Sequence, residues 1–330
     1  MKNKKILVIS LAIAIVGVGS IAKYILTQSS NSAVVRAESN ISEVEQTKSL
    51  DDVLGEQVTY DGHSYSRRHD IETVLFLGID KPADERLGEV IGQNGRSDTL
   101  LLCILDKTAK TTKLLEISRD TITDIDLYSL DGQYLFTANT HINMQYAYGT
   151  DAKDGSRLSK KAVSKLLYSI PIDYTVSLTM QGIATIVDAL GGVSINCNRD
   201  YTYIDKAFIK GSTIDMTGEQ AYNYVHYRDI SKDGSNNDRM DRQLDFIDAI
   251  NKAWKEGDAS ENLFKFTDAS KPYLASDIDG DTIKLLQDYK LERQINKLPG
   301  EDFVGELHDE YHVDQVALKK LILSLFYQEK

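Results

Sequence analysis

Charged residues flank three apolar runs of this chain, each short enough to be a buried strand. They are Asp80 after the run at 74–77, Arg96 and Asp98 before the run at 100–105, and Arg119 after the run at 114–117. The short segment 107–111 predicts an antiparallel hairpin between the second and third runs. If the first run is also antiparallel to the second, two carboxylates and two guanidinium groups meet at one edge of a sheet. Carboxylates bind hard cations and arginines bind phosphate, so this pattern predicts a metal-assisted phosphate site.

Further polar and cationic side chains of the same kind occur in the second half of the chain. Arg239 and Gln243 lie four residues apart at the start of a predicted helix, so they share one face, with Arg242 next to it. The N-terminus of that helix would add backbone N–H groups that favour phosphate. His226 and Arg228 lie two residues apart on a segment that we predict to be extended, so they point the same way. Each arginine, taken alone, could instead form an ordinary ion pair at the surface. The two aspartates could instead stabilise a turn or cap a helix. The combination of these residues favours one shared site.

Several common kinds of site are missing from the sequence. It has no GxxxxGK[ST] loop for nucleotide hydrolysis, no GxSxG nucleophile elbow and no His/Cys spacing typical of zinc. The formal net charge is −12, whereas general binding of nucleic acid depends on many cationic contacts to phosphate. We therefore expect no nucleic acid among the partners, although a local basic pocket is compatible with this charge.

The N-terminus predicts a membrane anchor. Residues 1–5 carry three lysines and form the expected cytoplasmic tail, and residues 6–26 are almost wholly apolar. That length spans roughly 30 Å, the thickness of a bilayer core, and the positive flank places the rest of the chain outside the cell. A cleaved signal peptide is the alternative, but its apolar region would be unusually long. We expect residues 27–70 to be an extracellular linker with a small hairpin near 58–65, and residues 71–330 to form the folded domain.

The remaining pattern predicts an α/β fold. We expect helices over 139–147, 158–168, 182–190, 218–224, 239–255, 280–289 and 313–326, and strands over 174–178 and 193–197, with an extended segment at 225–228. The helix between the strands at 174–178 and 193–197 predicts a βαβ unit and therefore a partly parallel sheet. Cys103 and Cys197 both fall in predicted strands. Two buried free thiols are the favoured interpretation, and a disulfide in an external location is the alternative.

Seven short motifs follow one another in the chain: LFLGID at 75–80, RSDT at 96–99, ISRDT at 117–121, IN at 142–143, DALGGV at 188–193, GEQAYNYVHYR at 218–228 and DRMDRQ at 238–243. In this order they resemble the LytR-CpsA-Psr (LCP) family, membrane-anchored glycopolymer transferases of the bacterial envelope. The resemblance covers residues 71–253. It implies an α/β/α sandwich with a mixed central sheet, preceded by one transmembrane helix, and a long apolar pocket for a polyprenyl chain.

The resemblance also implies an activity. The chain would transfer a glycopolymer phosphate, such as teichoic acid or capsule, from a polyprenyl-pyrophosphate carrier to a sugar hydroxyl of peptidoglycan or another cell-wall acceptor. Mg²⁺ would be the cofactor, held by Asp80 and Asp98. The residues implied for pyrophosphate are Arg96, Arg119, Arg228, Arg239 and Gln243, with His226 beside them. Asp98, Arg96 and Arg119 would be the catalytic groups, and Asp98 is the suggested proton acceptor.

Three positions depart from the family pattern. Ser118 stands where a proline is usual, His226 where an arginine is usual, and His141 where a lysine is common. A histidine is mostly neutral near pH 7, so one fixed positive charge is missing from the expected pocket. Two alternatives to the transferase follow: a non-catalytic scaffold that binds lipid pyrophosphate, and a pyrophosphate hydrolase that uses water as the acceptor.

Overall fold

The computed structural model describes residues 54–80, 95–227, 273–278, 289–304 and 309–330, together with part of a helix between 241 and 253. The described residues of that helix are 241–243, 245, 246, 248–250, 252 and 253. The predicted anchor at 6–26, the spacer before residue 54 and residues 280–288 of the predicted helix at 280–289 lie outside the described residues. Within the described part of the chain, no helix is both long enough and apolar enough to cross a bilayer.

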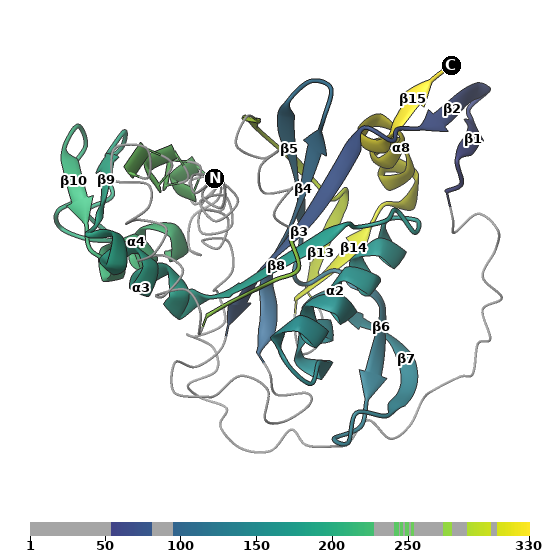
Figure 1. Ribbon diagram of the computed structural model, residues 1–330, viewed down its shortest axis with the longest axis horizontal. Helices are drawn as coiled ribbons and strands as arrows, with labels where there is room; N and C mark the ends of the chain where they lie inside the picture. Colours follow the sequence, from purple (N-terminus) through teal and green to yellow (C-terminus); the bar gives the residue numbers. More distant parts are fainter. Residues whose placement is uncertain are drawn as a thin grey trace, which may run out of the picture.

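A six-stranded mixed sheet forms the centre of the fold, in the order β11-β8-β3-β4-β5-β12 (Figure 1). Its strands are β3 (Ile71–Asp80), β4 (Arg96–Asp106), β5 (Thr111–Ile117), β8 (Tyr174–Thr179), β11 (Leu274–Ser276) and β12 (Lys290–Lys297). Strands β3, β4 and β5 are antiparallel neighbours, which confirms the prediction from the three apolar runs. Strand β8 runs parallel to β3, and β12 runs parallel to β5, so the sheet is mixed as expected.

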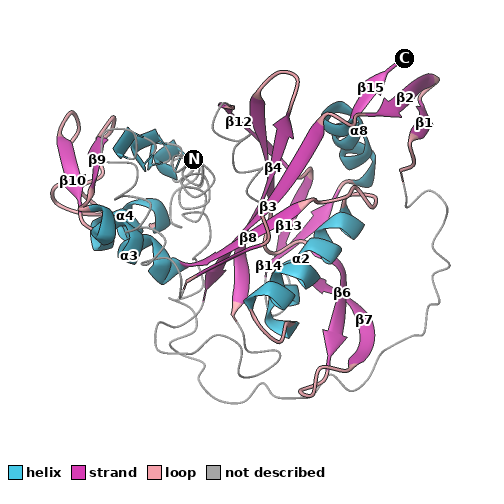
Figure 2. Ribbon diagram, in the orientation of Figure 1, coloured by secondary structure: helices cyan, strands magenta, loops and turns pink. Residues whose placement is uncertain are grey.

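Helices cover both faces of this sheet. Successive side chains of a strand point to opposite faces, so Val74 and Phe76 enter one core while Leu75 and Leu77 enter the other. The first core is closed by α3 (Met180–Leu190), α4 (Gly218–His226) and the helical residues between 241 and 253. The second is closed by the 3₁₀ helix η4 (Ile142–Tyr148), α2 (Ala152–Leu166) and α8 (Gln315–Phe326). Figure 2 shows α3 and α4 on one side of the sheet and α2 and α8 on the other. Burial on both faces explains why the central strands are continuous apolar runs.

Four smaller sheets surround this centre within the described residues. Strands β1 (Gln57–Tyr60), β2 (His63–Arg67) and β15 (Tyr327–Glu329) form a three-stranded sheet. The others are the two-stranded pairs β6 (Ile122–Tyr128) with β7 (Tyr134–His141), β9 (Val193–Asn196) with β10 (Thr213–Met216), and β13 (Gly300–Val304) with β14 (Asp309–Val313). The predicted hairpin near 58–65 is present, and its turn residues Asp61 and Gly62 have positive φ angles of 52° and 80°. Its second strand pairs with the last strand of the chain.

The prediction of an α-helix over 139–147 was wrong. Residues Asn139–His141 belong to strand β7, where they pair with residues 122–124 of β6, and only residues 142–148 are helical, as 3₁₀ helix η4. Antiparallel pairing with the preceding strand β6, across the short connection at 129–133, decides this segment, because local propensity is a weak signal for strands.

The prediction of a βαβ unit over 174–197 was also wrong. Strand β8 lies in the central sheet, but β9 pairs with β10 in a separate ribbon. Gly191, at a φ of 86°, ends α3 as expected, and the chain then continues into that ribbon. The parallel pairing comes instead from β8 beside β3, after a crossover that contains α2. A third correction concerns residues 225–226, which are helical because α4 continues to His226.

Cys103 and Cys197 are free and buried in the same core, which confirms the favoured interpretation of two buried thiols. Burial raises the pKa of the Cys103 thiol to about 12. Both cysteines therefore act as small apolar core residues.

The end of the β4–β5 hairpin is fixed by an arginine between two carboxylates. Arg68 donates from Nε and Nη2 to Asp70 at 3.0 and 2.8 Å, and from Nη2 to Asp106 at 2.6 Å. Asp70 also accepts a hydrogen bond from the Thr108 hydroxyl at 2.7 Å. The Arg68 guanidinium, followed by the Thr108 hydroxyl, lowers the pKa of Asp70 to about 2. The ionised form of Asp70 is therefore the one that stabilises the fold.

We predict that this group contributes to acid sensitivity. A carboxyl whose pKa is lowered on folding adds stability above its unfolded pKa of about 3.9, and this stability is lost as the pH falls through 2. Urea unfolding of the full-length chain should show that Asp70→Asn is less stable than wild type at pH 6, with a difference that shrinks steadily between pH 4 and pH 2. The exposed Asp215→Asn serves as the control, and a constant difference for Asp70→Asn across that range would contradict the prediction.

Candidate active site

The four charged residues that flank the apolar runs meet at one edge of the central sheet. Asp80, at the end of β3, pairs in register with Arg96, at the start of β4. Asp98 lies two residues further along β4, and only 2% of its side chain is exposed. Arg119, just after β5, donates from Nη1 to Oδ2 of Asp98 at 2.7 Å. The structure therefore brings together two carboxylates and two guanidinium groups, as the strand order required.

Asp98 is a carboxyl group in an environment that opposes its charge. Burial raises its pKa, Arg119 lowers it, Asp80 raises it again and Arg96 lowers it, and the balance is a pKa of about 6. The opposing effect of Asp80 shows that the two carboxylates are close enough to repel each other. A group with a pKa near 6 can exchange a proton near neutral pH, which an ordinary aspartate rarely does.

A short turn holds Arg119 in place. The Ser118 hydroxyl accepts a hydrogen bond from the backbone N–H of Asp120 at 3.3 Å, and the Ser118 carbonyl accepts one from the Thr121 hydroxyl at 2.6 Å. Arg119 Nε lies 3.4 Å from Oδ1 of Asp120, so its guanidinium is held between two carboxylates. Serine at 118 therefore stabilises this turn through its side chain, which a proline at that position could not do.

Asn143 is a residue of this site that sequence reasoning did not single out. It is buried at the start of η4, and its Nδ2 lies 3.5 Å from Oδ1 of Asp98. Its backbone N–H donates to the carbonyl of Arg119 at 3.4 Å, and its own carbonyl accepts from the Ser97 hydroxyl at 3.3 Å. Its side-chain oxygen is buried and has no hydrogen-bond partner among the described residues. The signal available in the sequence was the IN motif at 142–143.

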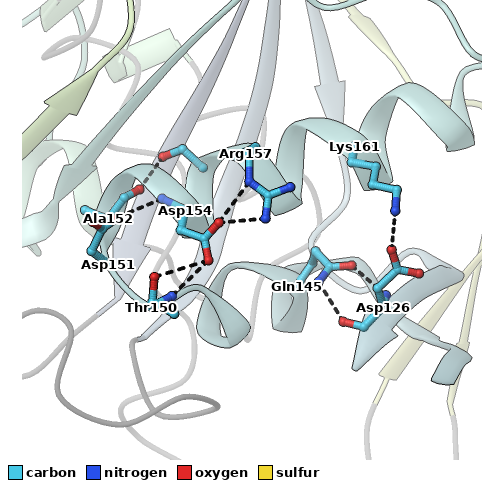
Figure 3. A network of polar contacts seen from close by, with 9 residues as sticks. Asp126, Gln145, Thr150, Asp151, Ala152, Asp154, Arg157 and Lys161 are labelled. Atoms are coloured by element: carbon cyan, nitrogen blue, oxygen red, sulfur yellow. Dashed lines mark hydrogen bonds and ion pairs between the residues drawn. The ribbon is translucent and has the colours of Figure 1, made fainter. Parts of the chain in front are cut away.

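A second carboxamide holds η4, and with it Asn143, against the neighbouring strand. Gln145 accepts the backbone N–H of Asp126 at 2.8 Å and donates to its carbonyl at 2.9 Å, as a two-point clamp on β6. The Asp126 carboxylate in turn accepts from Lys161 of α2 at 2.7 Å. Figure 3 shows this chain of contacts beside the capping network at the start of α2, in which Asp151 and Asp154 take part. Asn143 is thus positioned by groups that lie outside the site.

Helix α4 reaches the same edge through two rings. Tyr222 and His226 lie four residues apart on α4, and their rings stack with centroids 4.9 Å apart and an angle of 15° between planes. Burial raises the pKa of Tyr222, and the charge of Asp80 raises it further, so the phenol lies near the Asp80 carboxylate. The stacking holds the His226 ring against Tyr222 at the C-terminal end of α4. The i, i+4 spacing on a helix was the signal for Tyr222, but it required the correct end of α4.

Close contact with α3 sets the position of α4. The capping box of Thr217 and Gln220 starts the helix. Gly218 donates its backbone N–H to the Asp188 carboxylate at 2.6 Å, and a Cβ at Gly218 would lie 2.1 Å from the carbonyl oxygen of Ala184. Only glycine permits this approach, so the DALGGV and GEQA motifs dock α3 and α4 together.

The C-terminal end of α4 is held by two side chains of the following helix. Arg242 is 1% exposed and donates from Nε to the carbonyl of Tyr224 at 2.8 Å and from Nη2 to the carbonyl of Tyr227. Gln243 is also buried, and its Nε2 donates to the carbonyl of Val225 at 3.1 Å. These bonds satisfy carbonyls that the helix end leaves without partners, and the guanidinium charge suits the negative end of the helix dipole. In this structure Gln243 therefore stabilises the helix that carries His226. Arg242 has the same structural role, which the sequence analysis did not predict.

Two predicted site residues, Arg228 and Arg239, lie outside the described residues. Within the described residues, no group of three or more His, Cys, Asp or Glu side chains is arranged to hold a metal ion. His141, the third departure from the family pattern, lies at the end of β7 with its Nε2 3.0 Å from the carbonyl of Asp309. It therefore contacts the β13–β14 ribbon.

Comparison with known proteins agrees with this arrangement. The sequence model of the LytR_cpsA_psr family matches residues 24–323. A polyisoprenyl-teichoic acid–peptidoglycan teichoic acid transferase, TagU of Bacillus licheniformis, is 30% identical over 276 residues, which cover 82% of this chain and 76% of the relative. Among solved structures, the protein gbs0355 of Streptococcus agalactiae superimposes with a TM-score of 0.58 at 22% identity, covering 78% of this chain and 86% of that one. TagT bound to LI-WTA gives a TM-score of 0.54 at 23% identity, covering 82% and 95%.

The fold, the order of the motifs and the extent of these matches define one class of protein: a mixed α/β domain with charged residues gathered at one edge of its central sheet. The chain belongs to the LytR-CpsA-Psr family.

We predict that Arg242 stabilises the fold strongly. Arg242→Met keeps most of the side-chain volume but removes the charged hydrogen bonds to the end of α4, and the expected loss is about 3 kcal/mol of unfolding free energy. The control is Arg199→Met, because Arg199 is 55% exposed and pairs with Asp241 at 3.2 Å. Exposed pairs contribute less than about 1 kcal/mol. Denaturant unfolding of the full-length chain measures both, and equal losses in the two variants would contradict this assignment.

Proposed function

We propose that this protein transfers a teichoic-acid-type glycopolymer phosphate from a polyisoprenyl-pyrophosphate carrier to a sugar hydroxyl of peptidoglycan. The observation that supports it best is the buried Asp98–Arg119 pair beside Asp80 and Arg96, at one edge of the sheet. Phosphoryl transfer needs mainly positioning and charge stabilisation, and this edge offers cationic and anionic groups within reach of one another. The activity of the B. licheniformis relative, as its name states it, is of the same kind.

In this proposal three of the four residues take part in the transfer step. Arg96 and Arg119 bind the phosphate oxygens and stabilise the charge that develops on them. The acceptor hydroxyl oxygen attacks phosphorus, the bond from that phosphorus to the bridging oxygen breaks, and polyisoprenyl phosphate leaves. Asp98 accepts the proton of the acceptor hydroxyl, as the buried carboxylate at this edge. Arg119, bonded to Asp98, keeps that carboxylate oriented.

We also propose that a Mg²⁺ ion binds at this edge, held by Asp80 and Asp98. The donor set fits a hard cation, because both residues offer carboxylate oxygens, and Asn143, whose Nδ2 lies 3.5 Å from Asp98, has a side-chain oxygen without a partner among the described residues. The repulsion between the two carboxylates is a further argument, since a cation between them would relieve it. When bound, the ion would neutralise charge on the pyrophosphate.

His226 and the residues outside the described part of the chain complete the proposal. In this proposal His226 donates a hydrogen bond to the phosphate from the end of α4, where its ring stacks on Tyr222. Arg228 and Arg239 would supply the remaining cationic groups, and residues 6–26 would anchor the chain so that the domain faces outward. Binding at the membrane surface would give the site access to a lipid-linked substrate.

We predict that site variants lose transfer without losing the fold. Full-length chain in detergent micelles is incubated with a polyprenyl-pyrophosphate glycan and a peptidoglycan acceptor, and the phosphodiester product is quantified. Arg119→Ala should lower the rate by about 10²–10³-fold, and Asp98→Asn by about 10²–10⁴-fold, while the control Asp215→Asn keeps wild-type activity. Wild-type turnover by both site variants would refute the mechanism. Lipid binding without any product would favour the scaffold, and product release to water without an acceptor would favour the hydrolase.

The metal assignment has its own prediction. Treatment of the full-length chain with a chelator should abolish transfer, and added Mg²⁺ should restore it. Asp80→Asn should raise the Mg²⁺ concentration needed for half-maximal activity by tenfold or more, because one of two ligand carboxylates is lost. Full activity after exhaustive chelation would exclude a Mg²⁺ requirement while leaving the transferase proposal open to the preceding test.

A further inference from the structure

A cavity of about 550 Å³ lies between α8 and the three-stranded sheet β1-β2-β15. Its size falls within the range of about 300–1,000 Å³ that is typical of small-molecule sites. It is separate from the candidate active site, because β2 leads into the start of β3 whereas Asp80 lies at the end of β3. Ten strand residues span roughly 30 Å. Figure 1 shows α8 and β15 beside β1 and β2, away from the sheet edge described above.

The walls of this cavity come from two regular surfaces. The strand register places five side chains on one face of the small sheet: Tyr60, His63, Tyr65, Tyr327 and Glu329. Helix α8 faces them with Lys320, Leu323 and Ser324, whose i, i+3 and i+4 spacing puts them on one side of the helix. The turn residue Asp61 completes the lining. The cavity is therefore built from regular elements at both ends of the described chain.

Several polar groups that line the cavity have no hydrogen-bond or ion-pair partner among the described residues. Among the described residues, no hydrogen bond or ion pair engages the hydroxyls of Tyr60 and Tyr65, the carboxylate of Asp61 or the ammonium group of Lys320. Oε1 of Glu329 lies 2.6 Å from Nδ1 of His63, which leaves its second oxygen as an acceptor. The cavity thus presents hydrogen-bond donors and acceptors side by side.

Aromatic rings form the apolar part of the cavity wall. Tyr327 is buried, and its hydroxyl is fixed by the carbonyls of Leu54 and Gly55 at 3.2 and 2.9 Å, so its ring has one orientation. Lys319 lies over the ring of Tyr60 at 5.6 Å from the centroid. Rings held in this way offer rigid apolar surface at low entropic cost.

We propose that this cavity is a saccharide-binding site for a neutral pyranose unit. A sugar carries hydroxyls that both donate and accept, which matches the mixed lining, and its C–H face can pack against a tyrosine ring. The lining holds two carboxylates, Asp61 and Glu329, against the single ammonium group of Lys320, so its balance of charge opposes the binding of a phosphate group. A purely apolar ligand would leave the unsatisfied hydroxyls and charges desolvated without partners. A neutral saccharide is the ligand class that satisfies both the rings and the polar groups.

The choice of a saccharide rests in part on the proposed function, whose donor and acceptor both contain sugars. A second sugar site roughly 30 Å from the sheet edge would hold a distant unit of a polymer while its end lies at Asp98. Two linked contacts raise the effective concentration of the reacting end without any new contact at the reaction centre. Binding at the cavity itself needs no turnover, so it can be tested even if the transferase proposal fails.

The test is calorimetric titration of the full-length chain in detergent micelles with a β-1,4-linked tetramer of N-acetylglucosamine. We expect saturable binding with one site per chain. Asp61→Asn removes the carboxylate charge while preserving the turn, because asparagine tolerates a positive φ, and Tyr60→Leu removes the ring but keeps apolar bulk against α8. Each variant should weaken the affinity by tenfold or more.

Matched controls carry the same changes elsewhere. Asp215→Asn on β10 and Tyr134→Leu on β7 alter exposed residues and should bind the tetramer as wild type does. Inorganic phosphate should neither bind nor compete. No binding by the wild-type chain, equal affinity in all variants, or competition by phosphate would each overturn the inference, whatever the result of the transfer assay.

Discussion

The ion pair of Asp98 and Arg119 is the interaction on which the site depends. Asp98 is almost completely buried, and a buried carboxylate without a partner costs several kilocalories per mole. The pair can form only if β4 starts where β5 ends, which the antiparallel register of these strands provides. It also needs the turn at Ser118 to direct Arg119 back towards the sheet. The geometry of the edge is therefore a consequence of strand order and one turn.

The position of helix α4 determines which side chains face that edge of the sheet. Helix α4 brings Tyr222 and His226 to Asp80, and its direction is set at both ends. At its start Gly218 lies against α3, and at its end Arg242 and Gln243 bind the terminal carbonyls. Mutation at any of these three contacts would move the rings relative to Asp80. The family motifs therefore include residues that act on the site only through the position of a helix.

The three central strands and the charged edge could be predicted from the sequence, because both depend on segments that are close together in the chain. The runs at 74–77, 100–105 and 114–117 are continuous and apolar because both faces of the sheet are covered, and their antiparallel order followed from short connections. The grouping of Asp80, Arg96, Asp98 and Arg119 followed from that order alone. Residues 139–141 were misjudged because they pair with β6 in a hairpin, and the partner of β9 was misjudged because no strand was predicted at β10. Arg242 and Gln243 looked alike in the sequence, as polar residues at a helix start, and only the end of α4 shows that both bind backbone carbonyls.

The small sheet β1-β2-β15 joins the first and last described residues of the chain. Leu54, where the described part begins, is bonded to Tyr327 near the C-terminus, at the end of β3 opposite Asp80. If residues 6–26 are the anchor, the tether enters the domain at the pole furthest from the catalytic edge. The 27 residues between them can span at most about 90 Å when fully extended. A substrate held in the membrane would then meet the catalytic edge only when that edge turns towards the bilayer. The length of that linker would then limit how far from the bilayer the enzyme can work.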